Sequence, residues 1–256
     1  MLKEERLLKI INKLNNKKST TIKKLAESFE VSDSTIRRDL NELEAKGYVK
    51  RTHGGAILKD KFDDEYNFIK KTNENKAEKK AIAKQAASLI NDGEIIAINS
   101  STLTYLMAKE LAAANLKIIS NSIDVINELS GIKKYDITVL GGDYVHLART
   151  IEGPITEKQI RAMHFDKAFL GVNGIDSSLG LSTASSIEAL SKKAMIDCSE
   201  QSFILSESRK FDKASFYKVA DFNEIDAIIT DQNLSEEKFA KYSQYSKIIK
   251  TKNEGE

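Results

Sequence analysis

The feature that most constrains the fold is a repeated change of apolar spacing after Lys76. Stretches with apolar residues at helical spacing, such as EKKAIAKQAASLI (78–90), alternate with short β-branched runs such as EIIAIN (94–99) and KIIS (117–120). This alternation is typical of βαβ units, in which helices join parallel strands. The sequence therefore predicts an α/β domain over 76–256, with a mostly parallel sheet and helices on both of its faces.

A second domain is expected because 256 residues exceed the length of a typical single domain. Residues 1–59 contain 14 Lys and Arg residues against 8 Asp and Glu residues, whereas the whole chain has a net charge of +2, so the remainder carries −4. A basic end on a neutral to acidic body is typical of nucleic-acid binding, although a solvated lysine-rich surface gives the same count. We predict a DNA-binding domain over 1–58 and a polar linker over 59–75.

The composition disfavours several other classes of protein. No apolar run reaches the roughly 18 residues needed to cross a bilayer, so we expect no membrane span and a cytoplasmic location. The single cysteine, Cys198, cannot form an internal disulfide and is expected to be a core residue. Because the three histidines are scattered and show no metal-ligand spacing, we expect no metal, no cofactor and no catalytic pair.

Three helices are predicted in the N-terminal domain. The first lies within 3–14, Thr21 caps a second helix over 22–29, and Ser32 caps a third helix that ends before Gly47. A pair of short helices of this kind, followed by a turn-rich segment, is typical of a helix-turn-helix that reads the major groove of DNA. A small helical bundle with surface arginines is the alternative.

The third helix and the segment after it carry the expected DNA contacts. Ile36, Leu40 and Leu43 form one apolar stripe, so the polar side chains of this helix face outward. The following GYVKRTHGGAIL (47–58) predicts a hairpin, or wing, placed to touch phosphates or the minor groove. The predicted contacts with double-stranded operator DNA are Thr21, Ser34, Thr35, Arg37, Arg38, Asn41, Lys50, Arg51 and His53.

In doubly wound sheets, ligands bind at the carboxyl ends of the strands. Asn99 ends one predicted strand and is followed by the hydroxyl-bearing residues Ser100, Ser101, Thr102 and Thr104 at the start of a helix. Hydroxyls and free backbone N–H groups at a helix N-terminus favour an anion, although N-capping alone needs only one of them. The sequence therefore predicts a phosphate site at this turn.

Three further turns follow predicted strands. Gly141-Gly142 allows a ligand or another backbone to come close, and a plain tight turn is an equal alternative. A second glycine-containing turn, Asn173-Gly174, precedes a helix that bears Glu188 and Lys192. Lys210 follows another strand, where it can neutralise a phosphate.

The segment VSDSTIRRDLNELEAKGYVKRTHGGA (31–56) resembles the signature of the DeoR family of bacterial repressors. The four turns resemble, in the same order, the sugar-phosphate-binding domain of that family, whose fold is similar to ribose-5-phosphate isomerase and the coenzyme A transferases. The resemblance covers about residues 2–231. It implies a repressor of sugar-metabolism genes that a phosphorylated sugar releases from its operator. Because a helix-turn-helix usually reads paired half-sites, a homo-oligomer, at least a dimer, is expected.

The same resemblance assigns roles to the turns. It implies that residues 99–104 form the phosphate loop and that Gly141-Gly142 and Asn173-Gly174 line the sugar pocket. It also implies that Glu188 and Lys210 contact or frame the effector.

Some residues depart from the family pattern. Members usually have Asp, Gly and Thr where this chain has Asn99, Ser101 and Leu103, and often an Arg at the position of Val145. We expect these departures to lie in the effector pocket, so the identity of the sugar phosphate stays open. Two other functions also stay open: an isomerase-like enzyme that uses Glu188 as a base, and a DNA-binding activator without a ligand.

Overall fold

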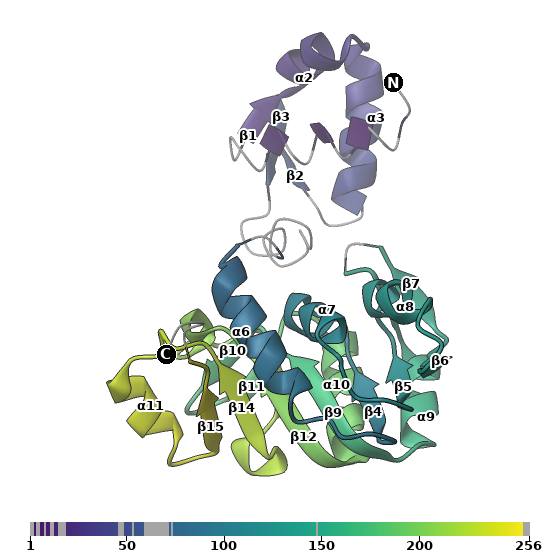
Figure 1. Cartoon of the computed structure of the whole chain (residues 1–256). Helices are drawn as coiled ribbons and strands as arrows, with labels where there is room; N and C mark the ends of the chain where they lie inside the picture. Colours follow the sequence, from purple (N-terminus) through teal and green to yellow (C-terminus); the bar gives the residue numbers. More distant parts are fainter. Residues whose placement is uncertain are drawn as a thin grey trace. The chain divides into compact units, whose positions relative to one another are not determined.

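The computed structural model describes residues 3, 6, 7, 9, 10, 13, 14, 19–45, 49–52, 54–58, 72, 74–146 and 148–252. The chain divides into two compact units, residues 1–67 and 68–256, and each is described by itself (Figure 1). The predicted wing residue His53, the predicted helix stop at Gly47 and most of the predicted linker over 59–75 lie outside the described residues.

Among its described residues, the smaller unit combines two continuous helices with a three-stranded antiparallel sheet, and the described residues between 3 and 14 are also helical. Its elements are β1 (Ser19–Thr21), α2 (Ile22–Phe29), α3 (Asp33–Ala45), β2 (Val49–Thr52) and β3 (Gly55–Leu58), in the strand order β1-β3-β2. Both predicted caps are present: the Thr21 hydroxyl accepts from the Lys24 N–H at 3.3 Å, and the Ser32 hydroxyl accepts from the Thr35 N–H at 3.3 Å. The predicted helix-turn-helix with its wing is confirmed.

Strand β1 is absent from the sequence prediction, because three polar residues carry no alternation of apolar and polar side chains. It lies so close to β3 that a Cβ added to Gly55 would be 2.0 Å from the Thr20 carbonyl oxygen. The missing side chain of Gly55 therefore allows β3 of the wing to pair with β1, and Gly55 also belongs to the turn of the wing.

One buried ion pair lies beside the apolar core of this unit. Leu25, Ile36 and Leu40 are fully buried in that core. Next to them, Arg6 Nε lies 2.6 Å from Asp39 Oδ2 and Arg6 Nη2 lies 3.1 Å from Asp39 Oδ1. Because the two residues are only 8% and 2% exposed, this bidentate pair fixes the N-terminal segment against α3. No pattern in the sequence distinguishes Asp39 from the exposed polar residues around it.

Replacing Asp39 with Ala is expected to destabilise the smaller unit by about 3 kcal/mol, because the Arg6 guanidinium would stay buried without its partner. The exposed Asp33, in the first turn of α3, is a matched control, and Asp33→Ala should cost less than about 1 kcal/mol. Urea unfolding of the full chain, followed by circular dichroism, measures both. Equal unfolding midpoints for the two variants would show that the ion pair does not stabilise the unit.

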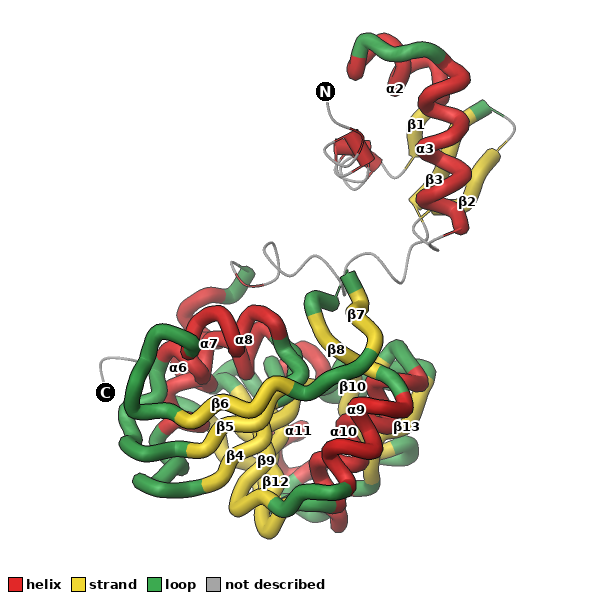
Figure 2. The backbone as a smooth tube through the Cα atoms, turned by 90° about the vertical axis from the view of Figure 1, so that its right-hand side faces the viewer, coloured by secondary structure: helices red, strands yellow, loops and turns green. Residues whose placement is uncertain are grey.

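The larger unit is built on a seven-stranded sheet in which every neighbouring pair of strands is parallel (Figures 1 and 2). The strand order is β15-β14-β12-β9-β4-β5-β6. The strands are β4 (Ile95–Ile98), β5 (Lys117–Ser120), β6 (Asp136–Val139), β9 (Phe165–Gly171), β12 (Ser199–Leu205), β14 (Ala227–Thr230) and β15 (Lys247–Lys250). The predicted parallel sheet is confirmed.

Helices cover both faces of this sheet, as predicted (Figure 1). They are α6 (Lys76–Ala87), α7 (Thr102–Lys109), α8 (Ile123–Leu129), α9 (Pro154–Arg161), α10 (Ser186–Asp197) and α11 (Glu236–Tyr242), with short 3-10 turns at Ser208–Lys210 and Phe222–Glu224. Ile96 and Ile98 of β4 pack in one apolar cluster with Met107 of α7, whereas Ala97 packs in a second cluster with Met195 of α10. Within the described ranges, no helix has the length and apolar character that a membrane span requires.

Two antiparallel additions were not expected from the sequence. One is the hairpin of β7 (Asp143–Val145) and β8 (Thr150–Glu152); the other is a small sheet of β10 (Gly174–Asp176), β11 (Gly180–Thr183) and β13 (Tyr217–Ala220). Strands of three or four residues are too short to show a clear period. The hairpin begins just after β6 and the small sheet just after β9, so both start at the carboxyl end of the parallel sheet.

Candidate functional site

The candidate site lies where the strand order of the parallel sheet reverses. From β4 the chain continues to β5 and β6 on one side, and it then crosses to β9, beyond which β12, β14 and β15 follow on the other side. Ligands of open α/β sheets bind outside the carboxyl ends of the strands at such a point. Asn99 follows β4, and Val172 and Asn173 follow β9. Lys210, after β12, reaches the same place, because its Nζ donates to the Val172 carbonyl at 2.5 Å.

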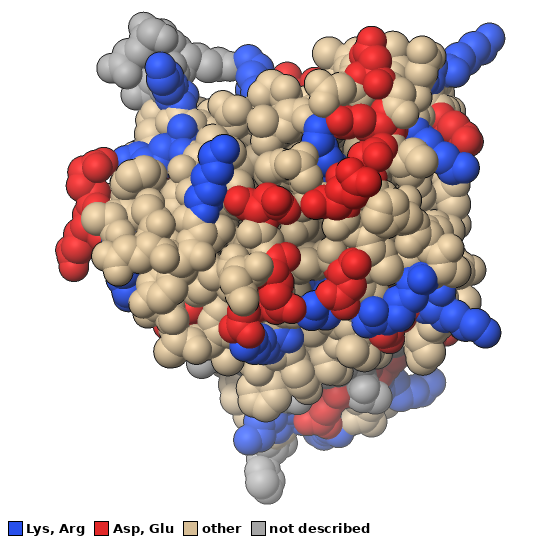
Figure 3. Space-filling model, turned by 90° about the horizontal axis from the view of Figure 1, so that it is seen from below, with Lys and Arg blue, Asp and Glu red and all other residues tan. Residues whose placement is uncertain are grey.

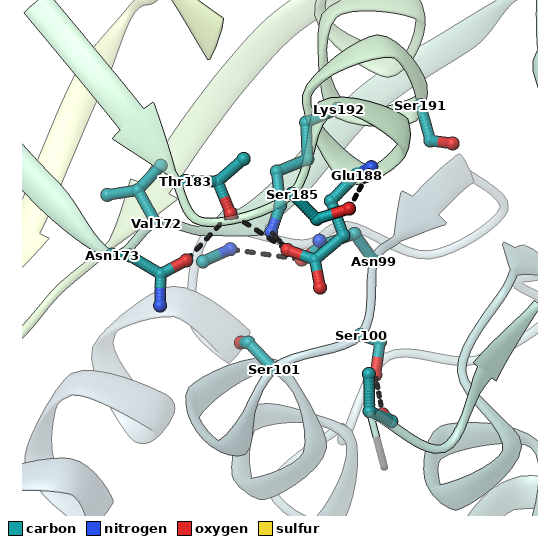
Figure 4. Close-up of polar contacts among 12 residues, drawn as sticks. Asn99, Ser100, Ser101, Val172, Asn173, Thr183, Ser185, Glu188, Ser191 and Lys192 are labelled. Carbon is teal, nitrogen blue, oxygen red and sulfur yellow. Dashed lines mark hydrogen bonds and ion pairs between the residues drawn. The ribbon is translucent and has the colours of Figure 1, made fainter. Parts of the chain in front are cut away.

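Asn99 joins the ends of β4 and β9 (Figure 4). Its side-chain oxygen accepts a hydrogen bond from the Gly171 N–H at 3.0 Å, and Asn99 is only 3% exposed. A Cβ added to Gly171 would lie 2.5 Å from the Ser101 Cβ. The predicted phosphate loop, 99–104, therefore rests directly against the end of β9.

The hydroxyl groups of this loop have different roles. Ser101 caps α7, since its side-chain oxygen accepts from the Thr104 N–H at 3.1 Å. Ser100 Oγ donates to the Ala148 carbonyl at 3.2 Å, in the connection between β7 and β8. Thr104 is fully buried and its hydroxyl lies 2.7 Å from the Asn99 carbonyl oxygen, so this hydroxyl is used inside the loop.

The N-terminus of α7 itself offers backbone donors. The first N–H groups of a helix have no intrahelical acceptor, and Thr102, the first residue of α7, is half-exposed. Leu103, in contrast, does not lie in the pocket as expected. It is 2% exposed and packs in the apolar cluster of α6 and α7, because the second position of this helix faces the core. Val145 is half-buried on β7.

Four polar side chains, called the polar cluster below, lie together near Asn99 (Figure 4): Asn173 after β9, Thr183 of β11, and Glu188 and Lys192 of α10. The Thr183 hydroxyl lies 2.7 Å from Asn173 Oδ1 and 2.8 Å from Glu188 Oε2. Lys192 Nζ lies 3.6 Å from the same Glu188 oxygen, and Lys192 is only 4% exposed. Lys192 is missing from the predicted site, although its spacing of four residues from Glu188 on one helix could have indicated the pair.

The two glycine turns are shaped by packing within the protein. The Gly141 N–H donates to the Gln159 side chain at 2.8 Å, and a Cβ on Gly142 would lie 2.1 Å from Thr156 Oγ1. Both contacts are with α9, and no described contact joins these two glycines to the cluster in Figure 4. At Gly174 a Cβ would lie 2.4 Å from the Lys213 carbonyl oxygen.

A buried ion pair joins the loop that carries Lys210 to the start of α6. Lys79 is fully buried, with Nζ 3.7 Å from Glu207 Oε1, and Asn75 Nδ2 donates to Glu207 Oε2 at 2.9 Å. Burial lowers the pKa of Lys79. Burial also acts to raise the pKa of Glu207, but hydrogen bonds from Arg209 and Asn75 outweigh it and hold that pKa below its usual value.

Glu152, at the end of β8, is a buried carboxyl group beside the polar cluster. It is 4% exposed, Asn121 Nδ2 donates to its Oε1 at 3.0 Å, and Ser191 Oγ lies 2.5 Å from its Oε2. Burial raises the pKa of Glu152 to about 7. The hydrogen bond with Ser191 and the charge of Lys192 oppose this rise, and the Glu188 carboxylate reinforces it.

The outward side of α3 carries the predicted DNA contacts. Ser34, Arg37, Arg38 and Asn41 are exposed, and Thr35 is half-exposed. These donors form the polar side of a helix whose other side is buried, as reading a groove requires.

Three predicted DNA contacts, Thr21, Lys50 and Arg51, lie outside α3, and their side chains have different surroundings. Thr21 and Lys50 are exposed, and Thr21 also caps α2. Arg51 turns back onto α3: its guanidinium donates to the Asn41 side chain, and its backbone N–H donates to Glu44 at 2.7 Å. These two hydrogen bonds hold β2, a strand of the wing, against α3.

The face of the larger unit drawn in Figure 3 carries charged side chains of both signs. Lys and Arg side chains lie there among Asp and Glu side chains, with no field of one sign. Many charges of this unit are paired, such as Lys193 with Glu224 at 2.8 Å. Such a surface lacks the electrostatic footprint of a nucleic-acid-binding face.

Comparisons with known proteins agree with the division of the chain into a helix-turn-helix unit and an α/β unit. A helix-turn-helix unit joined to a parallel α/β unit is the architecture of a DNA-binding transcription regulator. Residues 6–62 match the family model described as the DeoR-like helix-turn-helix domain, and residues 74–232 match that of the DeoR C terminal sensor domain. The chain belongs to the DeoR family.

Its relatives align along nearly their whole length. The chain is 35% identical to a lactose phosphotransferase system repressor of Lactococcus lactis subsp. lactis, over 98% of this chain and 99% of that protein. It is 34% identical to the HTH-type transcriptional repressor GlcR of Bacillus subtilis, over 91% of this chain and 90% of GlcR. A ribose 5-phosphate isomerase from Methanocaldococcus jannaschii matches with a TM-score of 0.37 and 15% identity, over 52% of this chain and 53% of that one, and carries no conclusion about activity.

The raised pKa of Glu152 predicts that the larger unit loses stability as the pH rises from about 4.5 to about 7, because the folded state keeps a proton that the unfolded chain releases. Glu152→Gln keeps the shape of the side chain and removes this titration. Relative to the wild type, its melting temperature should be higher at pH 8 than at pH 5 by about 5 °C. Thermal unfolding at both pH values measures the difference, which Asp143→Asn, on the exposed neighbouring strand, should not show.

Proposed function

We propose that the protein represses sugar-metabolism genes and releases its operator when a phosphorylated sugar binds in the larger unit. The observation that carries this proposal is the polar cluster at the strand-order reversal, in the same chain as an exposed DNA-reading helix. Relatives named as repressors support it, although one relative, from Haemophilus influenzae and 28% identical, is named an L-fucose operon activator. The proposed domains are 1–58 for DNA, 59–75 as the linker and 76–256 for the effector.

The effector phosphate is proposed to bind at the N-terminus of α7. There the capped helix offers free backbone N–H groups and the positive end of its dipole, and Lys210 lies at the neighbouring strand end. The hydroxyl groups of the sugar would then meet Asn173, Glu188 and Lys192, which offer donors and acceptors together. The proposed effector residues are Asn99, Ser100, Ser101, Thr102, Thr104, Gly141, Gly142, Asn173, Gly174, Glu188 and Lys210, with Lys192 added.

DNA reading is proposed for the outward side of α3, with the wing against the backbone. Arg38 and Asn41, both exposed, are proposed to meet base edges, with the Asn41 oxygen also accepting from Arg51, whereas Lys50 on β2 is proposed to meet phosphates. A dimer or larger oligomer would place two such helices on paired half-sites. Release requires the effector to favour the state that binds DNA poorly, because a ligand shifts a balance only through its different affinities for the two states.

A thermal-shift screen tests the effector class. Fructose 1-phosphate, fructose 6-phosphate, tagatose 6-phosphate and glucosamine 6-phosphate are compared with the same sugars without phosphate. A ligand bound only by the folded state raises the melting temperature. At least one phosphorylated sugar should do so and should weaken DNA binding in a gel shift. If none acts, the proposed effector class is wrong.

Thr102→Glu should weaken binding of the phosphorylated sugar that the thermal-shift screen identifies at least about tenfold while leaving DNA binding unchanged. A carboxylate at the start of α7 suits the helix dipole, so the fold is retained, but it repels a phosphate at the same place. Thr102→Gln is the matched control without the charge and should keep most of the affinity. Calorimetric titration of both variants measures the effect, and equal affinities would place the phosphate elsewhere.

Arg38→Ala should lower affinity for specific DNA about 10- to 100-fold, because a good side-chain contact with a base contributes about 1–3 kcal/mol of discrimination. The DNA is selected for binding from a random-sequence pool, and random DNA serves as the reference. Lys50→Ala should instead weaken both kinds of DNA alike and reduce the salt slope by about 1. Gel-shift titrations at several salt concentrations separate the two patterns, and an Arg38→Ala loss that is the same on random DNA would contradict base reading.

A further inference from the structure

Four large apolar side chains are exposed close together on α10 and β13 of the larger unit, two elements that contact each other. Ile187 and Leu190 of α10 are 46% and 51% exposed, and Tyr217 of β13 is 37% exposed. Phe216, just before β13, is 83% exposed, and its ring centroid lies 4.8 Å from that of Tyr217. These four residues are named the apolar patch. Single exposed apolar residues are ordinary, whereas a group of neighbouring ones marks an interaction site.

Helix α10 has α9 on one side and β13 on the other (Figure 2). Ser191 of α10 contacts Glu152, which lies just before α9. Lys193 Nζ lies 2.8 Å from Glu224, in the turn after β13. Residues two apart on a helix point in nearly opposite directions, so α9 and β13 flank α10 on opposite sides. Leu190 lies on the exposed part of α10 between these two flanks.

A shallow hollow of about 350 Å³ lies on the outward side of α9. It is lined by Pro154, Glu157, Lys158, Arg161 and Ala162. The methylene groups of the three long side chains add apolar surface to that of the two short ones. An apolar cavity of about 150 Å³ can hold a benzene ring, so the hollow has room for one aromatic side chain. Because α9 and α10 pack on the same apolar cluster through Ile160 and Met195, the hollow and the apolar patch belong to the same side of the sheet.

A projecting ring on one flank of α10 and a hollow on the other flank fit a second copy of the same chain. In a twofold interface the same surface meets itself, so a projection on one flank must meet a recess on the other. A twofold axis that lies in the interface and runs obliquely across α10 at Leu190 exchanges the two flanks. It places Phe216 of each copy against α9 of the other copy, where the hollow lies.

The exposed area of the apolar patch is suited to a dimer. With on the order of 200 Å² for each large side chain, the measured exposures leave about 400 Å² uncovered in each copy. Two copies then supply about half of the roughly 1,600 Å² that a stable interface buries. Polar side chains around an apolar centre ordinarily supply the rest of such an interface.

The charges beside the apolar patch also favour a second copy. Glu157 pairs with Arg161 at 2.9 Å on α9, and Lys218 pairs with Asp221 at 2.6 Å beside Phe216. Two identical surfaces carry the same net charge, so they meet without strong repulsion only when opposite charges are balanced within each surface. A strongly charged partner, such as nucleic acid, would instead require a field of one sign.

We propose that the apolar patch and the hollow on α9 form a twofold interface between two copies of this chain, with Phe216 of each copy in the hollow of the other. This inference rests on the proposed function in one respect, since reading paired half-sites requires a second copy. It adds the surface by which the copies meet. Helix α10 also carries Glu188 and Lys192 of the polar cluster, so one helix serves both the interface and the proposed effector site.

Sedimentation velocity of the full chain measures the association. The wild type should form dimers or larger assemblies at micromolar concentration. Leu190→Glu and Phe216→Glu should each raise the dissociation constant of this interface at least about 100-fold, because both residues are central to it and each change occurs twice. Val139→Glu is the matched control: Val139 is 50% exposed at the end of β6, the far edge strand of the parallel sheet, and this variant should associate like the wild type.

A cross-link tests the contact itself and leaves the apolar patch intact. In a Cys198→Ser background, Ala214→Cys, at an exposed position two residues before Phe216, is combined with Lys158→Cys in the hollow. A short bismaleimide should join two chains of this double variant, which a denaturing gel detects. Each single variant should give little cross-linked dimer, because the two positions meet only across copies.

Three results would overturn the proposal. One is association that neither Leu190→Glu nor Phe216→Glu weakens, or that Val139→Glu alone abolishes, since the interface then lies elsewhere. Another is a double-cysteine variant that associates but does not cross-link. The third is a wild type that stays monomeric, which would leave the apolar patch to a different protein and would also remove the oligomer from the proposed function. The first two results leave the proposed function intact, so the two failures are distinguishable.

Discussion

The candidate site depends on one buried hydrogen bond between the ends of two inner strands. The N–H of Gly171 at the end of β9 needs an acceptor, because an unpaired buried N–H costs about as much free energy as a lost hydrogen bond. Asn99, at the end of β4, supplies that acceptor, and the missing side chain of Gly171 lets Ser101 approach. This contact fixes the start of α7 against the strand whose continuation carries Asn173, and so it sets the spacing of the groups that an effector would touch.

The sequence was sufficient to predict the large elements of both units but not the small ones. The strands buried on both faces and the helices that cover them repeat a pattern over enough residues to be recognised, and the caps at Thr21 and Ser32 mark helix starts through a local rule. β1 and the strands of the hairpin have three residues each and are held by contacts with distant segments. Their pairing depends on contacts made in the folded protein, and such contacts produce no periodic pattern of apolar residues in the sequence.

The residue types of the site were predictable, whereas several roles were not. A run of hydroxyls after a strand indicates an anion site, but only the structure shows that Thr104 is used inside the loop and that Leu103 belongs to the core. Two buried charges could not be predicted. Glu152 and Lys79 look like ordinary surface residues in the sequence, because their partners come from segments far away along the chain.

The contacts of Glu207 tie the start of α6 to the loop that carries Lys210. Asn75 and Lys79, at the start of α6, are both held by this one carboxylate, so the connecting segment leaves the larger unit from an anchored point. The same short loop carries Lys210, whose ammonium group rests on the end of β9. A displacement of that loop would therefore also displace the start of α6, because the Glu207 carboxylate holds both Asn75 and Lys79.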